Sequence, residues 1–342
     1  MTDEKLHTQF SHCLSAMNRS EMGNCMIKNE VCYDSRDGVS KISAFRYEPD
    51  NKADVRAVVQ IVHGMAEYAE RYEEFAEFLT KQGVVVTADD HLGHGKTAQK
   101  SGKYGYFCEQ DAATVLVRDV HRLKKLTQME YPDVPYIIMG HSMGSFITRN
   151  YLCRYGTGVS GAIIMGTGMQ AKPVLAVARL MTRLQKVLFG PEHVSRFIDR
   201  LAFGSYNSRI PEPKTPYDWL SRDEERVAAY VQDAQCGFVF TVNGFETLFE
   251  LIHRLHKQEN VQNVPKKLPI LMVSGTADPV GGYGRGVQSA YDSLKKAGVE
   301  DITLKLFEEG RHELLNETNR EEIMQYLWNW IEDKILRDKL QN

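Results

Sequence analysis

The feature that most constrains this chain is a short apolar run that ends in a Gly-x-Ser-x-Gly pattern. Residues 136–139 are Tyr-Ile-Ile-Met, followed by Gly140, Ser142 and Gly144 and then by an amphipathic stretch. The apolar run predicts a buried strand and the stretch after it a helix. A serine on so sharp a turn is held clear of the sheet, because the glycines leave space that side chains would fill. Ser142 is therefore the candidate nucleophile, and the backbone N–H of Met143 is a candidate oxyanion donor.

Strands and helices alternate on both sides of this motif. The other candidate strands are at residues 28–34, 40–48, 56–62, 83–88, 161–165, 268–274 and 302–307. Candidate helices are at residues 68–81, 112–131, 142 onward, 287–297 and 320–336. A turn signal between the first two strands predicts a hairpin. The alternation is typical of an α/β fold, with a mostly parallel central sheet and helices on both faces.

A long segment between the strands at 161–165 and 268–274 interrupts this alternation, where an ordinary crossover is much shorter. Four helical patterns, at residues 174–188, 191–202, 221–236 and 244–256, predict a helical cap inserted into the sheet domain. Its expected inner face is apolar and comprises Leu175, Leu180, Leu184, Leu188, Phe238, Phe240, Phe245, Phe249 and Ile252. The predicted organisation is a lead-in with one short helix at 1–27, core at 28–167, cap at 168–264 and core again at 265–342.

The composition excludes some classes of partner. Of the 342 residues, 42% are hydrophobic and 25% are charged, which is typical of a soluble globular protein. A formal net charge of -3 gives no broad positive field, so neither nucleic acid nor an anionic membrane is expected as an electrostatic partner. The six scattered cysteines indicate free thiols in a reducing compartment. Neither a bilayer-spanning apolar run nor a secretory signal is recognised, so a cytoplasmic location is expected.

Three local patterns resemble binding motifs but lack parts of them. Residues 95–97 (Gly-Lys-Thr) match the end of a phosphate-binding loop, yet Asp90 stands where that loop needs its first glycine. The glycine-rich residues 281–286 lack the dinucleotide-binding spacing. His91 and His94 have a metal-ligand spacing but no further ligand cluster nearby. We expect this histidine loop to be structural, and we predict no metal or organic cofactor.

Two residues after the predicted cap complete a catalytic constellation with Ser142. A serine hydroxyl is a poor nucleophile unless an imidazole accepts its proton and a carboxylate orients that imidazole. Asp278 follows the end of one predicted strand, and His312 follows the end of the next. The chain order Ser, Asp, His is that of doubly wound hydrolases, which bind ligands at these strand ends. A turn-forming Asp278 and a helix-capping His312 are the alternatives, but the combined placement favours the triad.

The loop after the strand at 56–62 is the expected source of the second oxyanion donor. Within it, Met65 is the candidate, through its backbone N–H. Glu67 and Arg71 are four residues apart on the next predicted helix, a spacing that favours an ion pair on the protein surface.

Five motifs are spread along the chain from about residue 28 to its C-terminal end. They are His63-Gly64-Met65-Ala66-Glu67 with Arg71-Tyr72, Asp90-His91-Leu92-Gly93-His94-Gly95, Gly140-His141-Ser142-Met143-Gly144, Gly275-Thr276-Ala277-Asp278 and Gly310-Arg311-His312-Glu313. Together they resemble the monoacylglycerol lipase and lysophospholipase branch of the α/β-hydrolases, of the serine aminopeptidase S33 type. Two positions depart from that branch. Ala66 replaces the second glycine of His-Gly-x-Gly-Glu, and Leu315 stands where a polar residue is common.

The resemblance implies a cytosolic or peripherally membrane-bound serine hydrolase whose cap guides the single acyl chain of a lipid ester to the nucleophile. In this hypothesis Ser142 attacks the ester carbonyl, His312 accepts its proton and Asp278 orients His312. The N–H groups of Met65 and Met143 hold the oxyanion. A short-chain carboxylesterase, an amidase or aminopeptidase, and a non-catalytic binding protein on the same scaffold remain alternatives.

Overall fold

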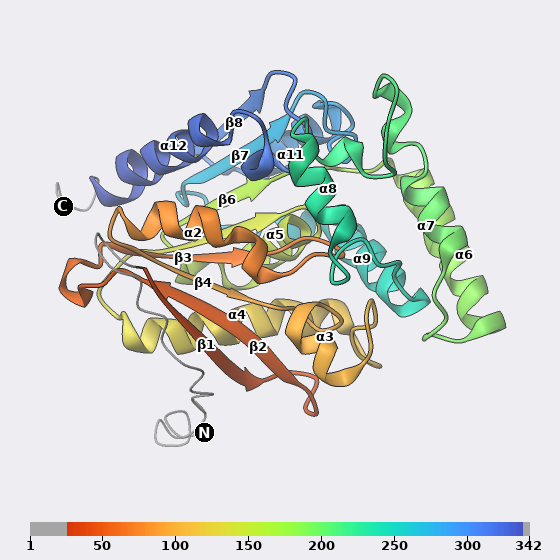
Figure 1. Cartoon of the computed structure of the whole chain (residues 1–342), viewed down its shortest axis with the longest axis horizontal. Coiled ribbons are helices and arrows are strands. Elements are labelled where there is room, and N and C mark those ends of the chain that lie inside the picture. The colour runs from red at the N-terminus through yellow and green to blue at the C-terminus, as the bar shows by residue number, and fades with distance from the viewer. Residues whose placement is uncertain (1–25, 338–342) are drawn as a thin grey trace.

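An eight-stranded sheet runs through the centre of the molecule (Figure 1). The computed structural model describes residues 26–337, so the short helix expected in the lead-in lies outside the described residues. The strands are β1 (Ile27–Asp34), β2 (Lys41–Glu48), β3 (Ala57–Val62), β4 (Val84–Asp89), β5 (Tyr136–His141), β6 (Gly161–Met165), β7 (Ile270–Gly275) and β8 (Ile302–Phe307). Their order is β1-β2-β4-β3-β5-β6-β7-β8.

The strand directions confirm the predicted fold class. β1 pairs with β2 as the expected antiparallel hairpin, and β2 is antiparallel to β4. Every other neighbouring pair, from β4 and β3 to β7 and β8, is parallel. All residues of β3, β4, β5, β6 and β7 are buried, because helices cover both faces of a parallel sheet. This explains why their sequences read as continuous apolar runs.

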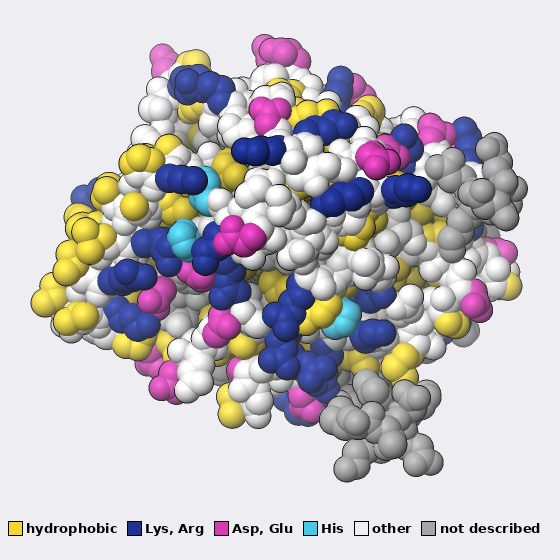
Figure 2. Space-filling model, turned by 180° about the vertical axis from the view of Figure 1, so that it is seen from behind, with side chains coloured by type: hydrophobic (Ala, Val, Ile, Leu, Met, Phe, Trp, Pro, Cys, Tyr) yellow, Lys and Arg dark blue, Asp and Glu magenta, His cyan; other side chains and the backbone are white. Residues whose placement is uncertain are grey.

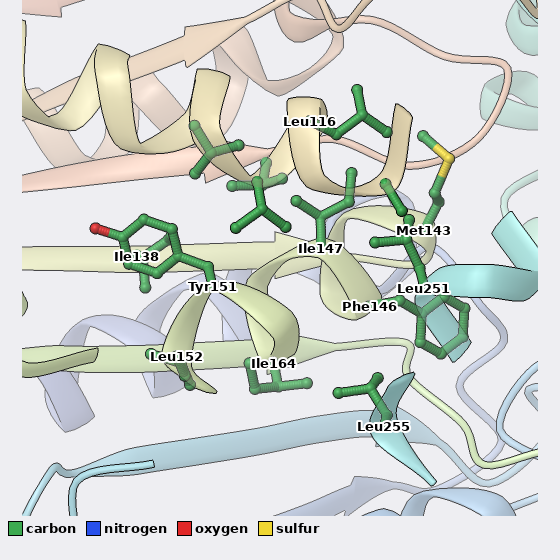
Figure 3. Packing of buried hydrophobic residues seen from close by; sticks show 14 of the residues in the cluster. Leu116, Ile138, Met143, Phe146, Ile147, Tyr151, Leu152, Ile164, Leu251 and Leu255 are labelled. Atoms are coloured by element: carbon green, nitrogen blue, oxygen red, sulfur yellow. The ribbon is translucent and has the colours of Figure 1, made fainter. Parts of the chain in front are cut away.

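Helices flank the sheet, and most of them belong to one of two separate cores. They are α2 (Glu73–Thr80), α3 (Gly95–Ser101), α4 (Ala112–Glu130), α5 (Met143–Tyr155), α11 (Arg285–Lys296) and α12 (Arg320–Ile331). α2 and α12 share one core on one face, and α4, α5 and α11 share another on the opposite face (Figure 1). Figure 3 shows Ile147 and Tyr151 of α5 in one cluster with Leu116 of α4 and Ile138 of β5. The helix that follows Ser142 is therefore held firmly against the sheet.

Between β6 and β7 the chain forms a helical segment at one side of the sheet (Figure 1). Its helices are α6 (Lys172–Phe189), α7 (Arg196–Phe203), α8 (Glu224–Gln232), α9 (Val242–Leu255) and α10 (Gln258–Val261). We call residues 168–264 the cap segment; that it is a separate inserted domain stays a prediction. α7 begins later than the pattern at 191–202 suggests, because Val194 pairs with Thr241 as an isolated bridge and Ser195 caps the helix.

The predicted inner face of the cap segment is partly wrong. Leu180, Leu184 and Leu188 on α6 are 52%, 48% and 71% exposed. On α6 only Leu175 and Thr182 are buried, so the helix packs through a narrow stripe and turns these leucines outward. The remaining predicted residues do lie inward, and these are Leu175, Phe238, Phe240, Phe245, Phe249 and Ile252.

Candidate active site

Ser142 occupies a strained turn between β5 and α5. Its φ is 53° and its ψ is -120°, a conformation that residues with side chains rarely adopt. The flanking glycines are required by close backbone contacts. A Cβ atom on Gly144 would lie 1.9 Å from the carbonyl oxygen of Val62, and one on Gly140 would lie 2.4 Å from the Gly144 carbonyl oxygen. The sequence pattern is thus explained by packing of the turn against β3.

His312 and Asp278 form a buried pair behind this turn. His312 Nδ1 lies 3.0 Å from Asp278 Oδ1, and the carboxylate also accepts hydrogen bonds from Ser274 Oγ and the Val280 N–H, both at 2.9 Å. Burial by itself raises the pKa of Asp278, but His312 and these donors hold it below its ordinary value. The carboxylate is therefore charged and fixed, as a residue that orients an imidazole must be.

A cavity of about 670 Å³ brings the other predicted site residues together. Ser142, His312, Met65 and Met143 all line it, while Asp278 lies behind His312. Met143 is the first residue of α5, where a helix leaves its N–H groups without intrahelical partners. Much of the remaining lining is apolar or aromatic and comes from the cap segment and α5.

The loop after β3 is held by side chains of other motifs. The Gly64 N–H donates to Glu67 Oε1 at 2.5 Å, and the Ala66 N–H donates to His94 Nε2 at 3.2 Å. Burial lowers the pKa of His94 to about 3, so its ring is neutral and Nε2 can accept this bond. Met65 stands between these two anchored amides and faces the cavity.

The cap segment also binds this loop directly. The carbonyl oxygen of Ala66 accepts hydrogen bonds from Tyr230 Oη at 3.1 Å and from the Gly237 N–H at 3.0 Å. The position of Met65 therefore depends on the core and on the cap segment together.

The histidine loop packs inside the protein. The rings of His63 and His91 stack with centroids 4.0 Å apart, and the His91 N–H donates to His63 Nε2 at 3.1 Å. Asp90 accepts hydrogen bonds from the N–H groups of Ala69 and Lys96. The amide of Lys96 at the start of α3 thus binds a carboxylate from its own loop, where a P-loop would bind phosphate.

Glu67 and Arg71 form the ion pair that their spacing predicts, but the predicted surface location is wrong. Their closest nitrogen and oxygen are 2.7 Å apart, and the side chains are only 4% and 12% exposed. Arg71 also donates to both carboxylate oxygens of Glu313, at 2.7 and 2.8 Å. Burial follows because Glu313 adds a second carboxylate and Tyr230 of the cap segment covers the guanidinium at 4.8 Å.

His141, which precedes the candidate nucleophile, belongs to the same hydrogen-bond network as Glu67. Its sequence context predicted no role for it. Its Nδ1 lies 3.1 Å from Glu67 Oε1 and 2.9 Å from Tyr72 Oη, and its Nε2 lies 3.3 Å from the His312 carbonyl oxygen. Burial alone lowers the pKa of His141, but the Glu67 carboxylate raises it above its ordinary value. The network connects the turn at Ser142 with the loop that carries His312.

The chain is similar to known proteins in both sequence and structure. The sequence profile of the family described as "Serine aminopeptidase, S33" matches residues 53–319. A solved carboxyl esterase from Bacillus coagulans, in complex with glycerol, superposes with a TM-score of 0.84 at 32% identity, covering 91% of this chain and all 100% of that chain.

Curated relatives include monoacylglycerol lipases. The monoacylglycerol lipase of Mycolicibacterium smegmatis is 28% identical over 288 residues, which are 83% of this chain and 90% of the lipase. The monoglyceride lipase of Rattus norvegicus is 27% identical over 265 residues, 77% of each chain. The chain is thus similar to lipases of this type over most of its length.

Proposed function

The chain belongs to the serine aminopeptidase S33 family of α/β-hydrolases, and on that premise we propose that it hydrolyses carboxylic esters of single-acyl-chain lipids. The observation that carries the proposal is the buried His312–Asp278 pair beside Ser142, at a cavity of about 670 Å³ lined largely by apolar side chains. Such a cavity suits one acyl chain. The named activities of the esterase and lipase relatives support the same reaction class.

The proposed mechanism uses five groups of this chain. Ser142 Oγ attacks the ester carbonyl while His312 accepts its proton, and Asp278 stabilises the resulting imidazolium. The N–H groups of Met65 and Met143 donate to the oxyanion. His312 then gives the proton to the leaving alcohol, which leaves an acyl-enzyme. Water attacks the acyl group by the same route, which releases the fatty acid and restores Ser142.

Hydrolysis of monoacyl esters by the purified protein tests this assignment. Ser142→Ala should reduce kcat by about a thousandfold or more and abolish labelling by a fluorophosphonate. Ser289→Ala, an exposed serine on α11, is the matched control and should leave both unchanged. Substantial activity in Ser142→Ala would mean that another residue is the nucleophile.

An amidase or aminopeptidase is the second candidate, because the matching family is described by that activity. It would use the same triad, so only the substrate separates the two. We expect kcat/KM for a medium-chain ester to exceed that for the matching amide. A faster amide reaction would favour the peptidase activity.

We also propose that the cap segment contacts lipid surfaces. Hydrophobic side chains gather at the left edge of Figure 2, where α6 and α7 lie, with Lys and Arg beside them. The most exposed are Val174, Val177, Leu180, Leu184, Val187, Leu188, Phe189, Phe197 and Leu201. No helix among residues 26–337 is both long and apolar enough to cross a membrane. A basic amphipathic helix such as α6 is suited instead to lie in the interface.

Co-sedimentation with vesicles that contain anionic lipid tests this contact. Leu188→Ser, at a side chain that is 71% exposed, should weaken sedimentation severalfold. Val39→Ser, at an 89% exposed residue of the β1–β2 turn, is the control and should have no effect. Equal binding of both variants and the wild type would place the contact elsewhere.

A further inference from the structure

The candidate active-site cavity contains one acidic side chain without a partner. Asp199 of α7 is half-buried and lines the cavity. Within residues 26–337 its carboxylate makes no hydrogen bond or ion pair. The two other carboxylates of the lining differ, because Glu67 and Glu313 are both paired with Arg71. Asp199 is therefore the cavity's uncompensated negative charge.

The described residues of the cavity lining include no cationic partner for this carboxylate. Neither lysine nor arginine is among the described residues that line the cavity. Burial raises the pKa of Asp199 above its ordinary value, as expected for a carboxylate that has lost water without gaining a cation. A neutral headgroup would leave this charge unpaired in a poorly solvated site, whereas a cationic headgroup would compensate it.

Aromatic side chains of the cap segment line the same cavity. The pKa of Tyr217 is raised mainly by burial and also by the charge of Asp199. The two side chains are therefore electrostatic neighbours. The Tyr217 ring centroid lies 5.0 Å from that of Tyr230. The Tyr206 and Trp219 centroids are 4.9 Å apart, and Trp219 lies 5.1 Å from the His312 ring. Aromatic faces attract ammonium groups, especially next to a carboxylate.

We propose that the alcohol part of the preferred ester carries an ammonium group, which Asp199 and the neighbouring aromatic rings bind. This inference rests on the ester hydrolase function proposed above. The acyl chain is assigned to the apolar lining from α5, α6 and α9, which includes Phe146, Leu175 and Phe249. The segment from Asp199 to Tyr230 supplies the aromatic rings and the unpaired charge, so it binds the headgroup.

A pair of esters that differ in charge tests the proposal. Lauroylcholine is compared with its uncharged analogue, in which a carbon atom replaces the quaternary nitrogen. For the wild type we expect kcat/KM to favour the cationic ester by about tenfold or more, the effect of one charge-assisted contact with cation–π support. Asp199→Asn keeps the shape and removes the charge, so it should lose most of this preference, measured as the ratio of kcat/KM for the two esters.

Glu225→Gln is the matched control. It removes one negative charge from α8 of the same cap segment at an exposed position outside the cavity lining, and it should retain the wild-type preference. Equal kcat/KM for the two esters in the wild type would overturn the inference, as would an unchanged preference in Asp199→Asn. If the wild type hydrolysed neither these nor other monoacyl esters above the Ser142→Ala level, the proposed function itself would be wrong.

Discussion

At the scale of single residues, the backbone of Ala66 is strained beside a proposed oxyanion donor. Its φ is 52°, a left-handed value that costs an alanine about 1 kcal/mol and a glycine almost nothing. Ala66→Gly should therefore raise the free energy of unfolding by about 1 kcal/mol, measured in urea.

Where the backbone is helical, replacing alanine by glycine should change the free energy of unfolding in the opposite direction. Ala229→Gly, at an exposed position of α8, should lower the free energy of unfolding by about 1 kcal/mol, because glycine is a poor helix former. If both variants were destabilised equally, the conformation of Ala66 would carry no strain.

The candidate site residues could be predicted because each one is marked by a local pattern. Ser142 stands between glycines, while Asp278 and His312 follow strands. The partners of Arg71 could be predicted only in part. Glu67 is four residues from Arg71, a spacing that predicts an ion pair. Glu313 is 242 residues from Arg71, and no local pattern connects Glu313 with Arg71. Burial of the network depends on this distant contact.

At the scale of elements, Arg71 joins the turn before α2 to the loop after β8. Glu313→Gln would leave this buried guanidinium with one carboxylate instead of two. We expect the free energy of unfolding to fall by about 2 kcal/mol, because removing one partner of a buried pair leaves charge uncompensated. Chemical denaturation of the purified variant measures this.

A surface pair gives the control. Lys81 and Glu77 are joined across 2.9 Å on α2 and its end, but their side chains are 52% and 53% exposed. Glu77→Gln should cost less than about 0.5 kcal/mol, since solvent screens such pairs. A similar loss in both variants would contradict the role assigned to burial at Arg71.

The strands were easier to predict than the faces of the cap helices. A strand buried on both faces is mostly apolar, so β3 and β5 are evident from their runs of apolar residues. α6 carries apolar residues on more than one side, and periodicity does not tell which of them face the protein. Only its packing, with Leu175 inward and Leu188 outward, decides this.

At the scale of the whole molecule, buried neutral histidines make stability depend on pH. The pKa of His94 is lowered by burial to about 3, below its ordinary 6.5. The unfolded chain therefore binds a proton that the folded chain excludes, and stability falls as the pH falls below about 6.5. Between pH 7 and pH 5, His94 should account for a loss of about 2 kcal/mol.

Comparison of wild type with His94→Gln isolates this contribution. The glutamine carbonyl can still accept the Ala66 N–H, and it does not titrate. The stability of the variant must be subtracted from that of the wild type because two buried carboxyl groups act in the opposite direction. Burial raises the pKa of Asp90 to about 6 and that of Asp119 to about 7, and such groups add stability as the pH falls. The same pH dependence in both proteins would show that His94 is not the source.

The overall architecture followed from the alternation of strands and helices, but the cavity did not. Its walls combine Ser142, His312 and Asp199, which come from separate parts of the chain. Their side chains meet only after the sheet has formed and the cap segment has packed over its edge. For this reason sequence indicated the reaction class more readily than the headgroup.

The hydrogen bonds from Tyr230 and Gly237 to the Ala66 carbonyl have a consequence for protein engineering. Exchanging the cap segment for that of a relative is an obvious way to alter substrate range. Here such a chimera would also replace the groups that hold the Met65 amide in place. Grafts onto this scaffold should therefore keep both donors, or turnover will change along with selectivity.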